Sequence, residues 1–290
     1  MKVKTILGRI YYIIVAVCVL LHVVILSLSF FDNNQQEKYC RSIIPDREYQ
    51  TDEDNRRFVF SAQEIKNGEN CLRFYTAHME VSVYADDTLI YHVGQQAMPK
   101  VSPGVVWNYV EIPSGAEQIQ VMIRAVYPEV RQKQIDFSIG EYSQMYSGML
   151  YQSMPVSFIF LLEILLGFAM VLWWLIARTR MQMKQTMLHF GIFSFMTGIW
   201  ALNQTDAALL ILFPVRVESV FVSAIALILM VPFFMWFTKG FFDIEDKWGS
   251  DIICTLAYLD LAVQLILQLT GICGFRQMYT VTHVLLDDPT

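Results

Sequence analysis

The chain has 290 residues, of which 55% are hydrophobic, 14% aromatic and only 17% charged. Soluble globular domains carry about 25% charged residues, so this composition argues against an ordinary soluble enzyme. The formal net charge is −6 at pH 7, and nucleic-acid-binding surfaces are typically basic, so no nucleic-acid partner is expected. We interpret the chain as a membrane protein that carries one polar domain.

The excess negative charge is confined to one segment. Residues 32–153 contain 11 Lys and Arg against 17 Asp and Glu, which accounts for the whole net charge. A segment of about 120 residues has the usual size of a single domain. We therefore predict a cytoplasmic stub and transmembrane anchor over residues 1–31, an extracytoplasmic domain over 32–153, a multi-span membrane domain over 154–286 and a tail over 287–290.

The predicted anchor is an apolar run over residues 10–31, in which His22 is the only ionisable side chain. Its 22 residues are enough to cross a hydrocarbon core of about 30 Å as a helix. Three basic residues precede the run and place the amino terminus in the cytoplasm. A cleaved signal peptide is the alternative, but the run is long for one and no small-x-small cleavage site follows Ser29.

Four further full spans are predicted after the polar domain. They cover residues 154–177, 186–203, 217–237 and 252–272. Basic residues follow the first and the third of these spans and place the carboxyl ends of those two spans in the cytoplasm. The predicted topology is that of a multi-pass bacterial cell-membrane protein with its polar domain outside.

The carboxyl end begins one more apolar segment. Residues 279–286 read YTVTHVLL and are followed by DDPT. Eight helical residues cover about 12 Å, which is well short of a bilayer, and two aspartates in lipid would be costly. We expect a chain truncated within a membrane helix.

The polar domain reads as a series of short strands. The stretches rich in β-branched and aromatic residues are 71–78, 81–86, 88–93, 105–113, 119–128 and 135–140. Alternate residues are apolar in 81–84 and 119–123, as in half-buried strands. Several short strands at this spacing predict a β-sandwich or jelly roll.

Two candidate features lie in this domain. Trp107, Tyr109 and Arg124 can line a ligand cleft, because aromatic faces and an arginine suit sugars or carboxylates. The alternative is a core tryptophan, a cross-strand tyrosine and a surface arginine. Cys40 and Cys71 both lie outside the membrane in an oxidising compartment and form a candidate disulfide.

Metal and catalytic motifs do not emerge from the sequence. The acidic run at residues 51–57 (TDEDNRR) resembles a solvated loop, because it lacks the glycine and distal glutamate of a calcium loop. The five histidines are scattered, so neither a metal nor a cofactor is expected. No H-E-x-x-H, G-x-S-x-G, C-x-x-C or P-loop motif occurs, and no enzymatic activity is assigned to these residues.

Ionisable residues inside spans are functional candidates, because burying them in hydrocarbon is costly. Glu163 lies in the middle of a predicted span, and Asp260 shares one helical face with Gln264 and Gln268. A proton or cation path is one interpretation. A polar seam that joins helices by hydrogen bonds is the other, and we favour it because no other span supplies a basic partner.

The end of the third predicted span carries a recognisable pattern. Residues 198–206 read GIWALNQTD, and a hydrophobic loop and a proline follow. This stretch resembles bacterial seven-transmembrane receptors that carry diverse intracellular signalling modules, whose early helices often end in W-x-L-N-x-[ST]-D. The matching residues are Trp200, Leu202, Asn203, Thr205, Asp206 and Pro214. Residues 81–94 (VSVYADDTLIYHVG) resemble the galactose-binding-like jelly roll often fused outside such helices.

The resemblance implies an external sensor, a seven-helix relay and a cytoplasmic output, often a GGDEF diguanylate cyclase or a histidine kinase. The implied ligand is a small molecule or an envelope partner, and such receptors commonly work as homodimers. Two departures stand out: an extra amino-terminal span, and only four full receptor spans plus a stub. A transporter or permease subunit that uses Glu163, Asp206 and Asp260 is the alternative function.

Overall fold

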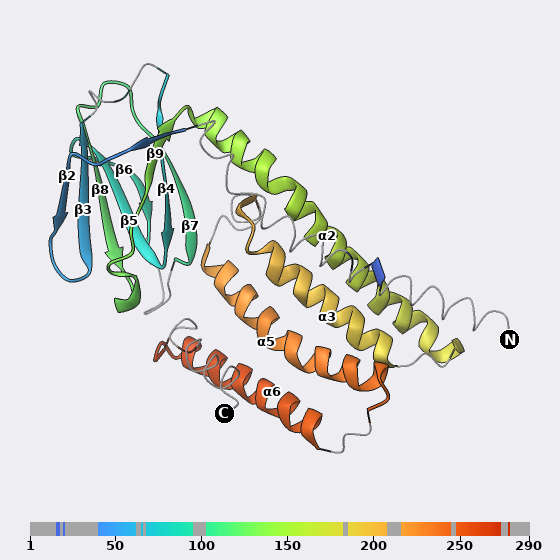
Figure 1. Ribbon diagram of the computed structural model, residues 1–290. Coiled ribbons are helices and arrows are strands. Elements are labelled where there is room, and N and C mark those ends of the chain that lie inside the picture. Colours follow the sequence, from blue (N-terminus) through green and yellow to red (C-terminus); the bar gives the residue numbers. More distant parts are fainter. Residues whose placement is uncertain are drawn as a thin grey trace.

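The computed structural model describes residues 16–17, 20, 40–61, 65, 68–94, 103–181, 185–207, 216–244, 248–273 and 278. Within them the chain forms a β-sandwich followed by long helices (Figure 1). The predicted anchor over residues 10–31 lies almost wholly outside this part of the chain, and the segment 279–290 lies entirely outside it.

The sandwich consists of two antiparallel sheets. One has the strand order β1 (Arg41–Ile43), β9 (Phe137–Gly140), β4 (Cys71–Ala77) and β7 (Val105–Glu111). The other has the order β2 (Arg47–Gln50), β3 (Asn55–Ser61), β8 (Gln118–Ala125), β5 (Met79–Ala85) and β6 (Thr88–Val93). The prediction of a β-sandwich is confirmed, whereas its assignment as a jelly roll stays a prediction.

The core of the sandwich lies between the two sheets. In β5 every second residue is buried, as the alternation of apolar residues in the sequence predicts. Four phenylalanines meet at its centre, where the ring of Phe137 lies about 5 Å from those of Phe58, Phe60 and Phe74. Offset aromatic packing of this kind fixes how the two sheets face each other.

Four long helices follow the sandwich and lie side by side in chain order (Figure 1). They are α2 (Tyr142–Met181), α3 (Gln185–Leu202), α5 (Arg216–Phe241) and α6 (Gly249–Leu269). Three segments, Tyr142–Ala177, Val220–Phe241 and Gly249–Leu269, are long and apolar enough to cross a membrane. These are the features of a multi-pass membrane protein.

The helices correct the expectation that came from the family resemblance. The described residues contain four long helices, not seven. Each of the four predicted spans falls on one of them, but α3 is not among the three segments that are long and apolar enough. Its polar residues, among them Gln185, His189 and Thr197, explain this. α3 lies between α2 and α5, where such side chains can be sheltered from lipid.

Glycines bring α2 and α3 close together. A Cβ atom on Gly167 of α2 would lie 2.6 Å from the backbone nitrogen of Phe195 and 2.8 Å from the carbonyl oxygen of Gly191. On Gly198 of α3 it would lie 3.0 Å from the backbone nitrogen of Ile164. The two backbones therefore approach at distances that only glycine allows, as in many membrane helix pairs.

The sandwich passes into α2 almost without a linker. β9 ends at Gly140 and α2 begins at Tyr142. The 40 residues of α2 extend about 60 Å at 1.5 Å per residue, about twice the hydrocarbon thickness. The first turns of α2 therefore lie beside the sandwich, and the later turns form the apolar span.

Candidate functional site at the sandwich–helix junction

One outer face of the sandwich is directed toward the helices. β4 and β7 pair so that Arg73 lies opposite Tyr109 and Tyr75 lies opposite Trp107. The neighbouring residue Phe74 is in the core, and successive side chains of a strand point to opposite faces. The four side chains therefore share the outer face of the sheet, which lies next to α2 and α3 (Figure 1). We call this region the junction.

Trp107 lies at the centre of the junction and contacts three groups. Its indole nitrogen Nε1 donates a hydrogen bond to Oδ1 of Asp206, just after α3, over 2.7 Å. The guanidinium carbon of Arg73 lies 5.0 Å from the centre of the indole ring. The ring of Tyr75 meets the indole edge-on, with 5.1 Å between ring centres. A side chain of the sandwich is thus fixed to the helical domain.

Tyr109 makes the second connection, to the first turns of α2. Its hydroxyl group donates to the sulfur of Met149 over 3.0 Å. Its ring meets those of Tyr142 and Tyr146 edge-on, with ring centres 6.3 Å and 5.8 Å away. Burial raises the pKa of Tyr109 well above its ordinary value. Burial raises the pKa of Tyr75 as well, and the negative charge of Asp206 adds to that rise.

Arg73 is a buried cation at the junction, with only 6% of its surface exposed. Its Nη2 donates to the sulfur of Cys40 over 3.2 Å. Its Nε has no hydrogen-bond partner, and within the described part of the chain Arg73 forms no ion pair with a carboxylate. The indole face of Trp107 is the group that offsets its charge by a cation–π contact.

The turn after α3 connects three parts of the molecule. Asn203 donates to the hydroxyl group of Ser223 on α5 over 2.9 Å. Ser157 on α2 donates to the hydroxyl oxygen of Thr205 over 2.9 Å. Asp206 accepts from Trp107 of β7. The polar residues of the pattern N-x-T-D therefore each contact a different element, and the pattern has a structural role that the sequence analysis did not assign to it.

The structure separates the three residues of the predicted ligand cleft. Trp107 and Tyr109 are both at the junction. Arg124 lies on β8 in the other sheet, where it is exposed and its Nε lies 3.0 Å from a carboxylate oxygen of Glu80. The outward faces of the two sheets point in opposite directions, so Arg124 does not share a surface with the other two.

The intramembrane carboxylates lie on separate helices. Glu163 is on α2 and is fully buried. Asp260 is on α6 and accepts a hydrogen bond from Gln264 of the same helix over 2.8 Å. Gln264 and Gln268 are themselves buried, as a polar seam between helices requires.

Cys40 and Cys71 are not joined by a disulfide in the structure. Cys40 immediately precedes β1 and Cys71 begins β4, and both strands pair with β9 between them. Two strand spacings amount to about 10 Å, whereas a disulfide requires Cα atoms within about 7 Å. Burial raises the pKa of the Cys71 thiol to about 12. The disulfide stays a prediction and would need the chain at Cys40 to move.

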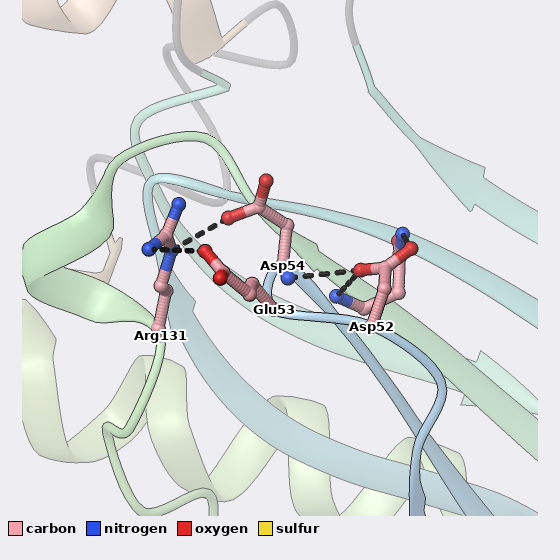
Figure 2. Close-up of polar contacts among 5 residues, drawn as sticks. Asp52, Glu53, Asp54 and Arg131 are labelled. Carbon is pink, nitrogen blue, oxygen red and sulfur yellow. Dashed lines mark hydrogen bonds and ion pairs between the residues drawn. The ribbon is translucent and has the colours of Figure 1, made fainter.

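The acidic run lies in the turn between β2 and β3 and is closed by its own hydrogen bonds (Figure 2). The carboxylate of Asp52 accepts the backbone N–H groups of Asp54 and Asn55 at 2.9 and 2.8 Å. The side-chain amide of Asn55 and these N–H groups lower the pKa of Asp52. Arg131 pairs with Glu53 at 3.2 Å and with Asp54 at 2.6 Å. Arg131 therefore offsets one of the three negative charges of this turn.

Arg73 and Tyr75 of the junction escaped the sequence analysis. Their signal is in the strands themselves: β4 reads CLRFYTA and β7 reads VVWNYVE, with large side chains on both faces. Strands that are covered on both faces show such unbroken patterns. β4 is buried at nearly every position, in accordance with a sheet that has the core on one side and helices on the other.

No protein-family model, curated protein or solved structure matches this chain. The function is therefore argued from the geometry of the junction.

Proposed function

We propose that the chain is the input and relay half of a transmembrane signalling receptor. The β-sandwich senses an extracytoplasmic ligand or partner, and the helices pass a change in its position across the membrane. The output is a cytoplasmic module, such as the diguanylate cyclase of the receptors that the chain resembles. The motifs of such a module are absent from these 290 residues.

The hydrogen bond between Trp107 and Asp206 is the observation that carries the proposal. A sensor domain that is only tethered to its membrane domain needs no such bond. Here the bond joins the sheet to the turn that also contacts α2 and α5, through Thr205 and Asn203. A shift of β7 would therefore act on three helices at once.

The connection between β9 and α2 supports the same proposal. Glu141 is the one residue between the strand and the helix. A flexible linker would absorb motion of the sandwich, whereas a helix that continues the strand moves with it. Signalling then requires two packings of the helices that differ in their affinity for the ligand.

The transporter alternative has weaker support. Asp206 accepts a hydrogen bond from Trp107 beyond the end of α3, and the carboxylate of Asp260 accepts one within its own helix. Glu163 is on a third helix. The three carboxylates therefore belong to different elements of the described chain.

Hydrogen exchange of the full chain in lipid nanodiscs tests the proposal. Asp206→Asn weakens the bond to Trp107 while keeping the shape of the side chain. We expect faster exchange not only in β7 but also in α2, α3 and α5. Asp243→Asn, in the loop after α5 and far along the chain from the junction, is the control. Faster exchange restricted to the sandwich would contradict a relay.

A further inference from the structure

We infer that a groove on the five-stranded sheet binds a small organic ligand through its carboxylate, with Arg47 and Arg57 as the recognising groups. The groove has a volume of about 630 Å³ and lies over β2, β3 and the start of β8. Sites for small molecules commonly enclose about 300–1,000 Å³. These strands form the side of the sandwich away from the helices (Figure 1).

The distribution of ion pairs singles out this groove. Four arginines of the sandwich are paired with carboxylates, namely Arg41 with Glu69, Arg56 with Glu48, Arg124 with Glu80, and Arg131 with Glu53 and Asp54. In the described residues of the sandwich, Arg47, Arg57 and Arg73 form no such pair. Arg73 belongs to the junction, and the other two line the same groove.

The guanidinium group of Arg57 is held in place and has one N–H group that makes no hydrogen bond within the described part of the chain. It lies on β3 opposite Tyr49 of β2. Its Nη2 donates to the side-chain oxygen of Gln120 on β8, which fixes the guanidinium group. Its Nε is buried and has no hydrogen-bond partner within the described part of the chain. A buried donor without a partner is costly, so a ligand that brings an acceptor to Arg57 would offset that cost, and a carboxylate is an anion that pairs well with a guanidinium group.

Arg47 and Tyr49 form the rest of the site. Nη1 of Arg47 lies 3.4 Å from the hydroxyl oxygen of Tyr49 and donates to it. Tyr49 is 46% exposed, so much of its ring is open to the groove. Val59, opposite Arg47 in the register, is buried and gives the groove an apolar floor. The two arginines thus share the groove with the exposed ring of Tyr49, against which a ring attached to the carboxylate can pack.

Acidic residues at the rim limit what can bind. Asp46 and Glu117 line the same groove and balance the two positive charges. Oδ2 of Asp46 accepts the backbone N–H of Ser61 over 2.6 Å, so Asp46 is held at the rim. A polyanion would meet repulsion there, whereas a ligand with a single carboxylate can face the arginines. The positions of the charged side chains, more than the net charge of the groove, therefore determine which ligands bind.

This inference names the ligand class of the proposed sensor and in that sense rests on the proposed function. The test is calorimetric titration of the full chain in lipid nanodiscs with two matched pairs of probes. Benzoate is compared with benzamide, and cyclohexanecarboxylate with cyclohexanecarboxamide. We expect at least one acid to bind at a single site, about tenfold or more tightly than its uncharged amide, because hydrogen bonds to charged groups have that magnitude.

Charge-removing variants locate the site. Arg57→Gln and Arg47→Gln should each weaken binding of the acid about tenfold or more. Arg124→Gln removes the same charge from the same sheet face outside the groove and should leave binding unchanged. The Arg47 side chain is exposed, so its substitution keeps the fold even if Arg57→Gln does not. Equal binding of acid and amide, no binding of either acid, or an equal loss in Arg124→Gln would overturn the inference.

The two proposals fail in different experiments. A groove that binds no carboxylate leaves the exchange result for Asp206→Asn untouched, so the relay can stand without this ligand. Conversely, a carboxylate can bind at Arg47 and Arg57 and leave hydrogen exchange in α3 and α5 unchanged. That result would support the binding site and contradict its role in sensing.

Discussion

Trp107 and Asp206 are 99 positions apart in the sequence and are joined by a hydrogen bond of 2.7 Å. The donor belongs to β7, in the sheet that faces the helices, and the acceptor lies just after the end of α3. Because the carboxylate is an anion and the bond is partly buried, it is stronger than a neutral surface bond. The sandwich and the helices therefore share a specific contact in addition to their covalent connection at Glu141.

Trp107→Phe tests the energetic weight of this contact. Phenylalanine retains most of the ring packing against Arg73 and Tyr75 but cannot donate to Asp206. We expect the free energy of unfolding to fall by about 1–3 kcal/mol, the usual cost of leaving a partly buried charged acceptor without its donor. Thermal unfolding in nanodiscs measures it. Trp248→Phe is the control, because Trp248 is 75% exposed. Equal losses in both variants would contradict a special role for Trp107.

Asp206→Asn changes the charge at the junction and should therefore change the titration of Tyr75. The charge of Asp206 is the second cause of the raised Tyr75 pKa, after burial. Removing it should lower that pKa toward its ordinary value without reaching it. Ultraviolet titration of tyrosinate, as a difference between variant and native chain, measures the shift. The charge of Asp206 also contributes to the raised pKa of Tyr109, so Tyr75→Phe in both backgrounds should reduce the difference without abolishing it. An undiminished difference would contradict the effect on Tyr75.

The sequence predicted the sandwich well where strands alternate and less well elsewhere. β5 and β8 bury alternate residues, so their apolar period identified them. β3 escaped, because its buried residues Phe58, Val59 and Phe60 are consecutive and do not alternate with exposed ones. The short strands β1 and β2 escaped as well, because β1 has three residues and all four residues of β2 are exposed. Strands of that kind carry no apolar period, and only their pairing with β9 and β3 defines them.

The junction shows a second limit of sequence reasoning. The sequence places Asp206 in a helix-end pattern and Trp107 in a predicted ligand cleft. Nothing in the sequence indicates that they meet, because the contact depends on how the outer face of the β4–β7 sheet is set against α2 and α3. Likewise, the residue type of Arg124 suits a ligand cleft shared with Trp107, but Arg124 lies on β8 in the other sheet.

Because the thiol of Cys71 is buried, we expect the free energy of unfolding to fall at alkaline pH. Its pKa is raised from 9.0 to about 12, chiefly by burial. The folded state therefore keeps the proton where the unfolded state releases it, and stability falls as pH rises from about 9 through 12. The contribution is on the order of a few kcal/mol at the upper end. Unfolding temperatures between pH 8 and 11 should fall less steeply in Cys71→Ala than in the native chain. Cys273→Ala should follow the native slope, and identical slopes for Cys71→Ala and the native chain would refute the prediction.

Gly167→Leu tests the close contact of α2 with α3. The added Cβ would meet the backbone of Phe195 and Gly191 at 2.6 and 2.8 Å, and backbone atoms cannot turn aside as a side chain can. The helices must separate, at a cost of about 1–3 kcal/mol or more. Ala169→Leu adds apolar bulk two residues away at an exposed position of the same helix and should cost much less. Because α3 also carries the turn with Asp206, separation of the helices should strain the bond to Trp107. We therefore expect Gly167→Leu, but not Ala169→Leu, to speed hydrogen exchange in β7, and unchanged exchange there would show that the helix pair and the junction are independent.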